Sequence, residues 1–179
     1  MASTQTKYIG LLGGSFDPAH KGHLSISKIA IKKLKLKKIY WVVTKKNPFK
    51  KKHLFSLKKR LSLAKSVVKS FQNIQVLYLD DIIKSSRSIE IIKYFYEKKK
   101  LKNIYFIIGS DILLELHKWK SWKKIVKLTK LIVFSRRGYD KKSVGSTVVK
   151  YLNKKNIIFI KNRPIQISSS LLRNKMKIN

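Results

Sequence analysis

The chain contains no cysteine among its 179 residues. This absence excludes a disulfide framework and any zinc site built from thiolates, and it fits a reducing compartment, so a cytoplasmic location is our expectation. No apolar run approaches the roughly 20 residues that a bilayer-spanning helix needs. Residues 1–14 also lack the charged, apolar and small-residue order of a signal peptide. We therefore expect a soluble protein with no membrane partner.

Acidic residues are scarce: 8 Asp and Glu stand against 43 Lys and Arg, a formal net charge of +35. Such an excess is typical of proteins that bind polyanions, so a basic nucleic-acid-binding module is one function to weigh. Arginine is rare as well, because only 6 of the 43 basic residues are Arg and the other 37 are Lys, spread along the chain. Surfaces that clamp phosphates or read bases favour Arg. The diffuse lysine excess favours a compositional origin in an AT-rich genome, and we expect no specific nucleic-acid partner.

Apolar periodicity predicts an α/β protein, because short β-rich runs alternate with longer amphipathic ones. We expect strands at 8–14, 38–44, 74–79, 103–109, 130–135 and 156–160, and helices at 23–34, 56–71, 88–100 and from about Ser168. Apolar side chains in 103–109 run almost without alternation, which indicates a strand buried on both faces. The pattern predicts a Rossmann-like parallel sheet flanked by helices, in a single domain spanning residues 1–179.

Polar segments follow four of the predicted strands. They are GGSFDPAHKGH (13–23), NPFK (47–50), GSD (109–111) and ISSSLLR (167–173). Ligands of parallel α/β sheets bind beyond the carboxyl ends of the strands, so these segments are the candidate site.

The segment 13–23 joins a predicted strand to a predicted helix. Gly13 and Gly14 let backbone amides approach a phosphate closely, and the helix N-terminus that follows favours an anion. His20 and His23 add two imidazole donors on one side of that pocket. The spacing is neither that of a P-loop nor the GxGxxG of a dinucleotide fold. A lone His is more often an ordinary surface or core residue, but two in one Gly-bearing loop favour a functional role.

A zinc site is a poor alternative for this histidine pair. The chain offers no Cys, and only His53 and His117 remain to complete a nitrogen site. We therefore expect no metal site made by the protein itself.

The segment GSFDPAHKGH resembles the signature of the nucleotidyltransferase superfamily whose hallmark is HxGH, here residues 20–23. The segment 167–173 is similar to the ISSTxIR element of the same superfamily. Between them, GSDILLELHKWKSW (109–122) is similar to the pattern GxDxxxxxxxWxxW of its nicotinate-nucleotide adenylyltransferase branch. The loops NPFK (47–50) and SRRGY (135–139) also look like segments of that branch, so the resemblance covers residues 8–173.

This resemblance implies transfer of AMP from ATP to nicotinate mononucleotide, a step of NAD biosynthesis that releases pyrophosphate. Mg²⁺ would ride mainly on the triphosphate. The implied catalytic residues are His20, His23 and Arg173. The implied ATP-binding residues are Gly13, Gly14, Ser15, Phe16, Asp111, Ile167, Ser168 and Ser169, and the implied acceptor-binding residues are Lys50, Ser88 and Trp119. Other acceptors of adenylyl transfer, phosphopantetheine or nicotinamide mononucleotide, stay open, and no feature of the sequence indicates an oligomeric state.

Four residues of these motifs have simpler structural explanations. Asp111 precedes the apolar run ILLEL and could be a helix N-cap. Trp119 and Trp122 could be core residues at i, i+3 of one helix, which we favour for Trp122, whereas the resemblance implies that Trp119 stacks on the pyridine ring. Asp17 could serve only to shape its turn.

The chain departs from the branch where YTxxT is usual, because Arg87, Ser88 and Ile91 stand there instead. Ser88 keeps a hydroxyl and a backbone amide, whereas Arg87 alters the wall of the expected nicotinate pocket.

Overall fold

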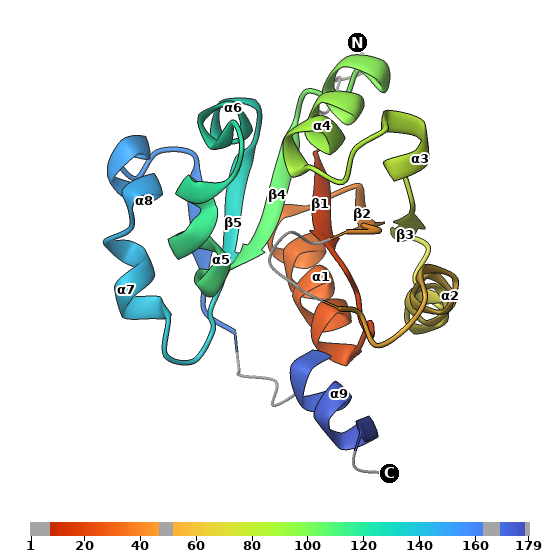
Figure 1. Ribbon diagram of the computed structural model, residues 1–179. Helices are drawn as coiled ribbons and strands as arrows, with labels where there is room; N and C mark the ends of the chain where they lie inside the picture. Colours follow the sequence, from red (N-terminus) through yellow and green to blue (C-terminus); the bar gives the residue numbers. More distant parts are fainter. Residues whose placement is uncertain (1–7, 47–51, 163–168, 178–179) are drawn as a thin grey trace.

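The centre of the computed structural model, which describes residues 8–46, 52–162 and 169–177, is a six-stranded parallel sheet (Figure 1). The strands lie in the order β3-β2-β1-β4-β5-β6. They are β1 (Ile9–Gly14), β2 (Lys38–Val43), β3 (Ile74–Leu77), β4 (Ile104–Gly109), β5 (Lys130–Phe134) and β6 (Ile157–Ile160). All five neighbouring pairs are parallel. The Rossmann-like parallel sheet predicted from the sequence is confirmed.

Helices connect the strands and cover both faces of the sheet (Figure 1). They are α1 (Lys21–Leu34), α2 (Leu57–Val68), α3 (Asp80–Ile83), α4 (Ser88–Lys93), α5 (Ser110–Glu115), α6 (Trp122–Leu128), α7 (Asp140–Val144), α8 (Thr147–Leu152) and α9 (Ser169–Lys177). The helix expected at 88–100 instead widens after Lys93 into a π-helical turn, η1 (Tyr94–Lys98). The strand expected at 74–79 ends at Leu77, and the short α3 that follows was not predicted. No helix in the described ranges is long and apolar enough to cross a membrane.

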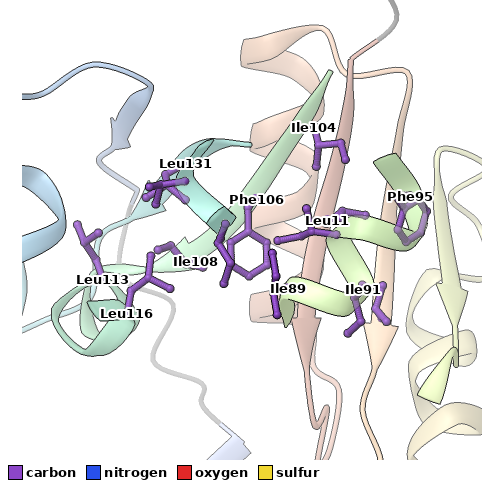
Figure 2. Close-up of a cluster of buried hydrophobic side chains, with 14 of the residues drawn as sticks. Leu11, Ile89, Ile91, Phe95, Ile104, Phe106, Ile108, Leu113, Leu116 and Leu131 are labelled. Carbon is purple, nitrogen blue, oxygen red and sulfur yellow. The ribbon is translucent and has the colours of Figure 1, made fainter. Parts of the chain in front are cut away.

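Two hydrophobic clusters lie on opposite faces of the sheet. On one face, α1 and α2 pack through Ala30 and Ala64 around the buried Trp41 of β2. On the other face, α4, α5, α6 and α8 pack over Leu11 and Phe106. Figure 2 shows Ile89 of α4 beside these two side chains. Strand β4 is buried throughout residues 104–108, as its unbroken apolar run predicted.

Strand β1 lies between β2 and β4, so successive strands are added in one direction from β1 to β3 and in the opposite direction from β4 to β6. At such a reversal of strand order, α/β sheets generally bind their ligands in a crevice beyond the carboxyl ends of the strands, here those of β1 and β4. Side chains pack closely against β1, because a Cβ added to Gly10 would lie 2.9 Å from Cγ1 of Ile39. The carboxyl ends of β1, β4 and β5 lie next to one another in the sheet.

Candidate active site

The loop after β1 leaves open space beside its glycines. A Cβ added to Gly13 would meet no atom of the described chain within 4 Å, and one added to Gly14 would make only ordinary contacts with Phe16. Packing within the protein therefore does not require glycine at either position. Unfilled space beside an exposed backbone is what a phosphate group needs to reach the amides.

Phe16 and Ser15 form the buried part of this loop. Phe16 has a φ of 45°, a left-handed conformation that is uncommon for a bulky side chain. Its ring stacks on Trp41 with 5.1 Å between centroids and an interplanar angle of 19°. Ser15 is buried as well, and its carbonyl accepts a hydrogen bond from Nη1 of Arg60 at 2.7 Å. Packing and hydrogen bonds thus over-determine the turn that directs the loop toward α1.

His20 is the N-cap of α1, and His23 lies in the first turn of the same helix. The backbone N–H of Gly22 donates to Nδ1 of His20 at 3.1 Å, and the N–H of His20 donates to Nδ1 of His23 at 3.3 Å. The two rings lie 4.0 Å apart between centroids. Because Nδ1 is an acceptor in both rings, each neutral imidazole carries its proton on Nε2. Both histidines are thereby set to donate through Nε2.

Electrostatics keep His20 neutral. Burial, reinforced by the positive charge of Arg136, lowers the pKa of His20 from 6.5 to about 4. A neutral ring keeps the Nδ1 lone pair that caps α1. A neutral His20 also adds no positive charge to that of the nearby Arg136.

His23 is braced by aromatic side chains and by the backbone of α1. Its ring lies 4.8 Å from that of Phe16 and 5.9 Å, edge on, from that of Trp41. The indole Nε1 of Trp41 donates to Oγ of Ser27 at 2.9 Å, and that hydroxyl donates to the carbonyl of His23 at 2.8 Å. The predicted pair of histidines is therefore brought together and rigidly supported.

Asp111 and Arg136 face each other at the carboxyl ends of β4 and β5. Nε of Arg136 lies 3.5 Å from Oδ1 of Asp111. The N-cap of α5 is Gly109 without a side-chain cap, and Asp111 is inside the first turn, so the N-cap explanation of Asp111 is wrong. A Cβ on Gly109 would lie 2.3 Å from Oδ1 of Asp111. The carboxylate thus folds back over the end of β4.

Arg136 was not among the site residues named from the sequence. Its guanidinium, 51% exposed, pairs with Asp111, and its positive charge helps to lower the pKa of His20. Its backbone N–H donates to Oγ of Ser110 at 2.9 Å and to Oδ1 of Asp140 at 3.0 Å. The hydrogen bond from Ser110 is the main reason that the pKa of Asp140 is lowered. The available signal was its place directly after a predicted strand, in the loop SRRGY.

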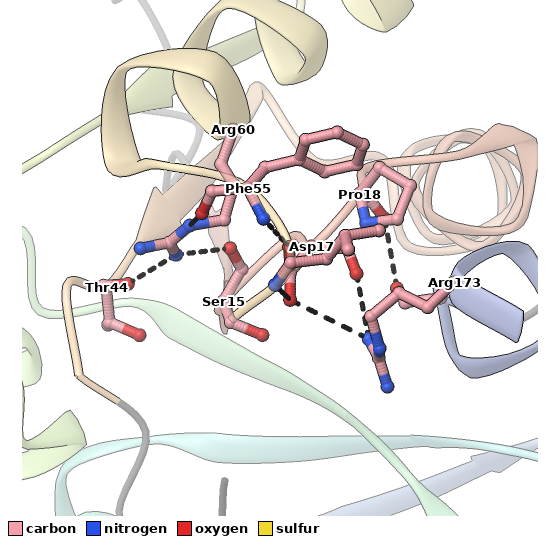
Figure 3. A network of polar contacts seen from close by, with 9 residues as sticks. Ser15, Asp17, Pro18, Thr44, Phe55, Arg60 and Arg173 are labelled. Carbon is pink, nitrogen blue, oxygen red and sulfur yellow. Dashed lines mark hydrogen bonds and ion pairs between the residues drawn. The ribbon is translucent and has the colours of Figure 1, made fainter. Parts of the chain in front are cut away.

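Helix α9 docks on the loop after β1 through two of its polar side chains (Figure 3). Oγ of Ser169 donates to the carbonyl of Pro18 at 3.0 Å, and Nη1 of Arg173 donates to the carbonyl of Asp17 at 2.8 Å. The predicted C-terminal element therefore lies beside the predicted N-terminal one, through contacts between residues 151 and 156 positions apart in the chain. Ile167, Ser168 and Lys50 lie outside the described residues.

Asp17 does more than shape its turn. Its carboxylate is fully buried and accepts the backbone N–H groups of Leu54 at 2.9 Å and Phe55 at 3.0 Å. Oδ2 also lies 3.9 Å from Nη1 of Arg173. Asp17 thus ties together the first loop, the segment before α2 and the C-terminal helix.

The two tryptophans are not on one helix. Trp119 ends the 3-10 turn η2 (Leu116–Lys118) in an extended conformation, and Trp122 begins α6 after Ser121 at a φ of 57°. Both are half-buried against the core: Trp119 lies edge on to Phe106 at 6.4 Å, and Trp122 lies 5.0 Å from Tyr151. The core role favoured for Trp122 agrees with this packing.

Ser88, the third acceptor-binding residue predicted, opens α4 and is half-buried. Its neighbour Ile89 packs in the same cluster as Phe106, against which Trp119 also packs. Ser88 and Trp119 therefore belong to elements that cover the same face of the sheet.

Comparison with known proteins decides the family. A profile described as cytidylyltransferase-like matches residues 11–175. A probable nicotinate-nucleotide adenylyltransferase of Pelagibacter ubique (strain HTCC1062) is 46% identical over 165 residues, which cover 92% of this chain and 91% of the relative. The chain belongs to the nicotinate-nucleotide adenylyltransferase family.

Other members of the nicotinate-nucleotide adenylyltransferase family are similar at lower identity. A probable enzyme of that name from Aquifex aeolicus (strain VF5) is 33% identical over 165 residues, covering 89% of this chain and 98% of the relative. Among solved structures, the Plasmodium falciparum nicotinic acid mononucleotide adenylyltransferase complexed with NaAD superposes with a TM-score of 0.73 at 20% identity, covering 94% of this chain and 83% of that one. The structural likeness supports the fold, and the sequence relatives confirm the resemblance inferred from the motifs.

Proposed function

We propose that this chain transfers the adenylyl group of ATP to nicotinate mononucleotide, giving nicotinate adenine dinucleotide and pyrophosphate, within one nucleotidyltransferase domain. The observation that carries the proposal is the pair of imidazoles of His20 and His23, whose Nδ1 atoms both accept backbone N–H groups, beside an open glycine loop at the switch point of the sheet. Both rings carry a hydrogen-bond donor at Nε2 that the helix cap does not use. Membership of the nicotinate-nucleotide adenylyltransferase family is the reason for proposing nicotinate mononucleotide as the acceptor.

The reaction needs little covalent help from the protein. An anionic phosphate oxygen of the mononucleotide attacks the α-phosphorus of ATP in line, the new P–O bond forms, and the bond to the bridging oxygen of pyrophosphate breaks. The task of the enzyme is to orient the reactants and to stabilise charge on the phosphoryl oxygens. The roles proposed are donation by His20 and His23 to ATP phosphates, aided by the backbone of residues 13–16.

The edges of the crevice supply the remaining roles. Arg136 and Arg173 are the guanidinium groups proposed to stabilise the triphosphate, which can receive paired hydrogen bonds from such a fork. Asp111 is proposed to bind the nucleoside of ATP, with Ser88 and Trp119 at the acceptor.

Magnesium is proposed to arrive with the nucleotide. Within the described ranges, no three His, Asp or Glu side chains lie together where a metal ion could be held.

An acceptor panel tests the assignment. Purified protein, ATP and Mg²⁺ are combined with nicotinate mononucleotide, nicotinamide mononucleotide or phosphopantetheine, and kcat/KM is measured for each. We expect the highest value for nicotinate mononucleotide. A higher value for either of the other acceptors would refute the proposed substrate while leaving adenylyl transfer in place.

A further inference from the structure

Arg60 is a buried arginine on a helix whose other charged residues face solvent. Its side chain is 2% exposed, whereas Lys58, Lys59 and Lys65 on the same helix α2 are exposed. Burying a guanidinium is costly unless its donors are satisfied and its charge is balanced. The contacts that offset this cost indicate what the residue does.

Within the described residues, the hydrogen bonds of the Arg60 guanidinium go to backbone carbonyls outside α2, and Figure 3 shows those to Ser15, Thr44 and Phe55. Nη1 donates to Ser15 at 2.7 Å and to Thr44 at 2.8 Å, Nε donates to Phe55 at 3.2 Å, and Nη2 donates to Lys45 at 3.4 Å. These acceptors belong to three segments: the loop after β1, the end of β2 and the residues before α2. The Arg60 side chain thus joins three segments of the chain by hydrogen bonds to their carbonyls.

Two buried carboxylates hold the same segments by their amides. Asp17 accepts the N–H groups of Leu54 and Phe55. Asp80 accepts the N–H of Lys45 at 2.7 Å and a short hydrogen bond from Oγ of Ser86. Burial lowers the pKa of Arg60, and the charges of Asp17 and Asp80 oppose that shift. In these segments the Arg60 guanidinium therefore binds backbone carbonyls, and the Asp17 and Asp80 carboxylates bind backbone N–H groups.

The bond from Arg60 to Ser15 lies where the sheet stops supporting the loop. The last backbone hydrogen bond described between the ends of β1 and β2 runs from the N–H of Thr44 to the carbonyl of Gly14 at 3.0 Å. One residue further on, Nη1 of Arg60 bridges the carbonyls of Ser15 and Thr44 and extends the connection past the end of the ladder. We propose that Arg60 is a positioning residue for adenylyl transfer, which fixes the loop of residues 13–16 to the end of β2 without touching substrate.

The inference rests on the proposed function for its readout, because loop position is measured through turnover. Lysine cannot replace the planar fork, since a single ammonium cannot reach carbonyls on several sides. In Arg60→Lys we expect kcat per folded molecule to fall roughly ten-fold or more, because small misplacements are costly in an oriented reaction, with KM for nicotinate mononucleotide within about three-fold of wild type.

A matched control separates positioning from stability. Val148→Ala removes methyl groups from a fully buried site on α8, and it should lower the melting temperature without moving the loop. At equal folded fraction, Val148→Ala should keep the wild-type kcat. Equal kcat per folded molecule in Arg60→Lys and Val148→Ala would overturn the proposal.

Hydrogen exchange on the unmutated protein gives a second test if Arg60→Lys does not fold. The amides of Thr44, Lys45, Leu54 and Phe55 should exchange at least about 100-fold more slowly than in an unstructured chain before any nucleotide is added. A non-hydrolysable ATP analogue should change these rates only a few-fold. Free exchange that slows only on nucleotide binding would refute a loop held by Arg60. Wild-type protein that forms no dinucleotide would instead refute the proposed function and leave the exchange result intact.

Discussion

The backbone N–H of His20 donates to Nδ1 of His23 at 3.3 Å, while Nδ1 of His20 accepts the N–H of Gly22. The two histidines proposed to bind ATP are therefore also the capping residues of α1. The two tasks use different nitrogens: Nδ1 holds the helix end, and Nε2 is the atom proposed to donate to ATP. Structural and catalytic roles of one ring can consequently be separated by substitution.

Substitution of His20 by Asn tests this separation. Asn is among the best N-caps, so His20→Asn should melt near wild type, whereas His20→Ala should lose about 1 kcal/mol of unfolding free energy. Both should reduce turnover roughly 10²-fold, the effect of removing one donor to a developing oxyanion. His23→Ala should reduce turnover similarly. Near-normal turnover in His20→Asn, measured beside its melting curve, would limit His20 to a capping role.

The ionisation of His20 gives a pH prediction. Its folded pKa of about 4 lies below the ordinary value of 6.5, so the unfolded chain binds the proton more tightly. Its contribution to stability is complete above about pH 6.5 and is lost as the pH falls through 4. ¹⁵N NMR of the ring should show the Nε2–H form at neutral pH and a higher pKa with an ATP analogue bound. A free-protein pKa near 6.5 would contradict the environment described.

Two glycine substitutions should separate ligand space from packing space. Gly13→Ala adds a methyl group where no described protein atom lies within 4 Å, so it should fold normally and raise KM for ATP by roughly ten-fold. Gly10→Ala places its methyl group 2.9 Å from Ile39, so it should lower the melting temperature. A Gly13→Ala enzyme with wild-type KM for ATP would place the triphosphate elsewhere.

Trp119 and Trp122 form a matched pair for the acceptor pocket. Stacking on an aromatic face contributes about 1–3 kcal/mol in nucleic-acid complexes, so Trp119→Ala should raise KM for nicotinate mononucleotide roughly ten-fold with KM for ATP little changed. Trp122→Ala should affect stability and leave both KM values alone. Separate substrate titrations and melting curves check both variants. Unchanged acceptor KM in folded Trp119→Ala would make Trp119 a core residue only.

The lysine excess should give weak binding to nucleic acid without sequence preference. Because such binding depends on counterion release, it should weaken steeply between about 50 and 200 mM salt. Fluorescence anisotropy with unrelated DNA and RNA oligonucleotides measures it. A tight, sequence-specific complex at physiological salt would support the nucleic-acid-binding module instead.

The strands were predictable because burial imposes a local pattern. Residues 104–108 are apolar without alternation, and both faces of β4 are covered. The ends of elements were less predictable, since α3 and the π-helical turn at Tyr94–Lys98 depend on contacts with neighbouring segments. Trp119 and Trp122 have helical spacing, yet the left-handed Ser121 separates them, a conformation that no local pattern indicated.

The candidate site could be located from the sequence where its residues are contiguous, as at His20 and His23, whose rings the structure brings together. Arg60 and Arg136 were missed because their partners come from distant segments: Arg60 joins Ser15 to Thr44, and Arg136 pairs with Asp111. The scarcity of arginine in the sequence was a usable signal. In a chain with 37 lysines, positions that keep Arg are candidates for sites that need a planar fork.

The central claim is adenylyl transfer to nicotinate mononucleotide at the crevice formed by His20, His23 and the loop after β1. The most direct measurement is a ³¹P NMR time course of the wild-type protein with ATP, Mg²⁺ and nicotinate mononucleotide. The account predicts that the ATP resonances are replaced by those of a dinucleotide pyrophosphate bridge and of free pyrophosphate in equal amounts. ATP consumed to ADP and phosphate, or to AMP without dinucleotide, would contradict it.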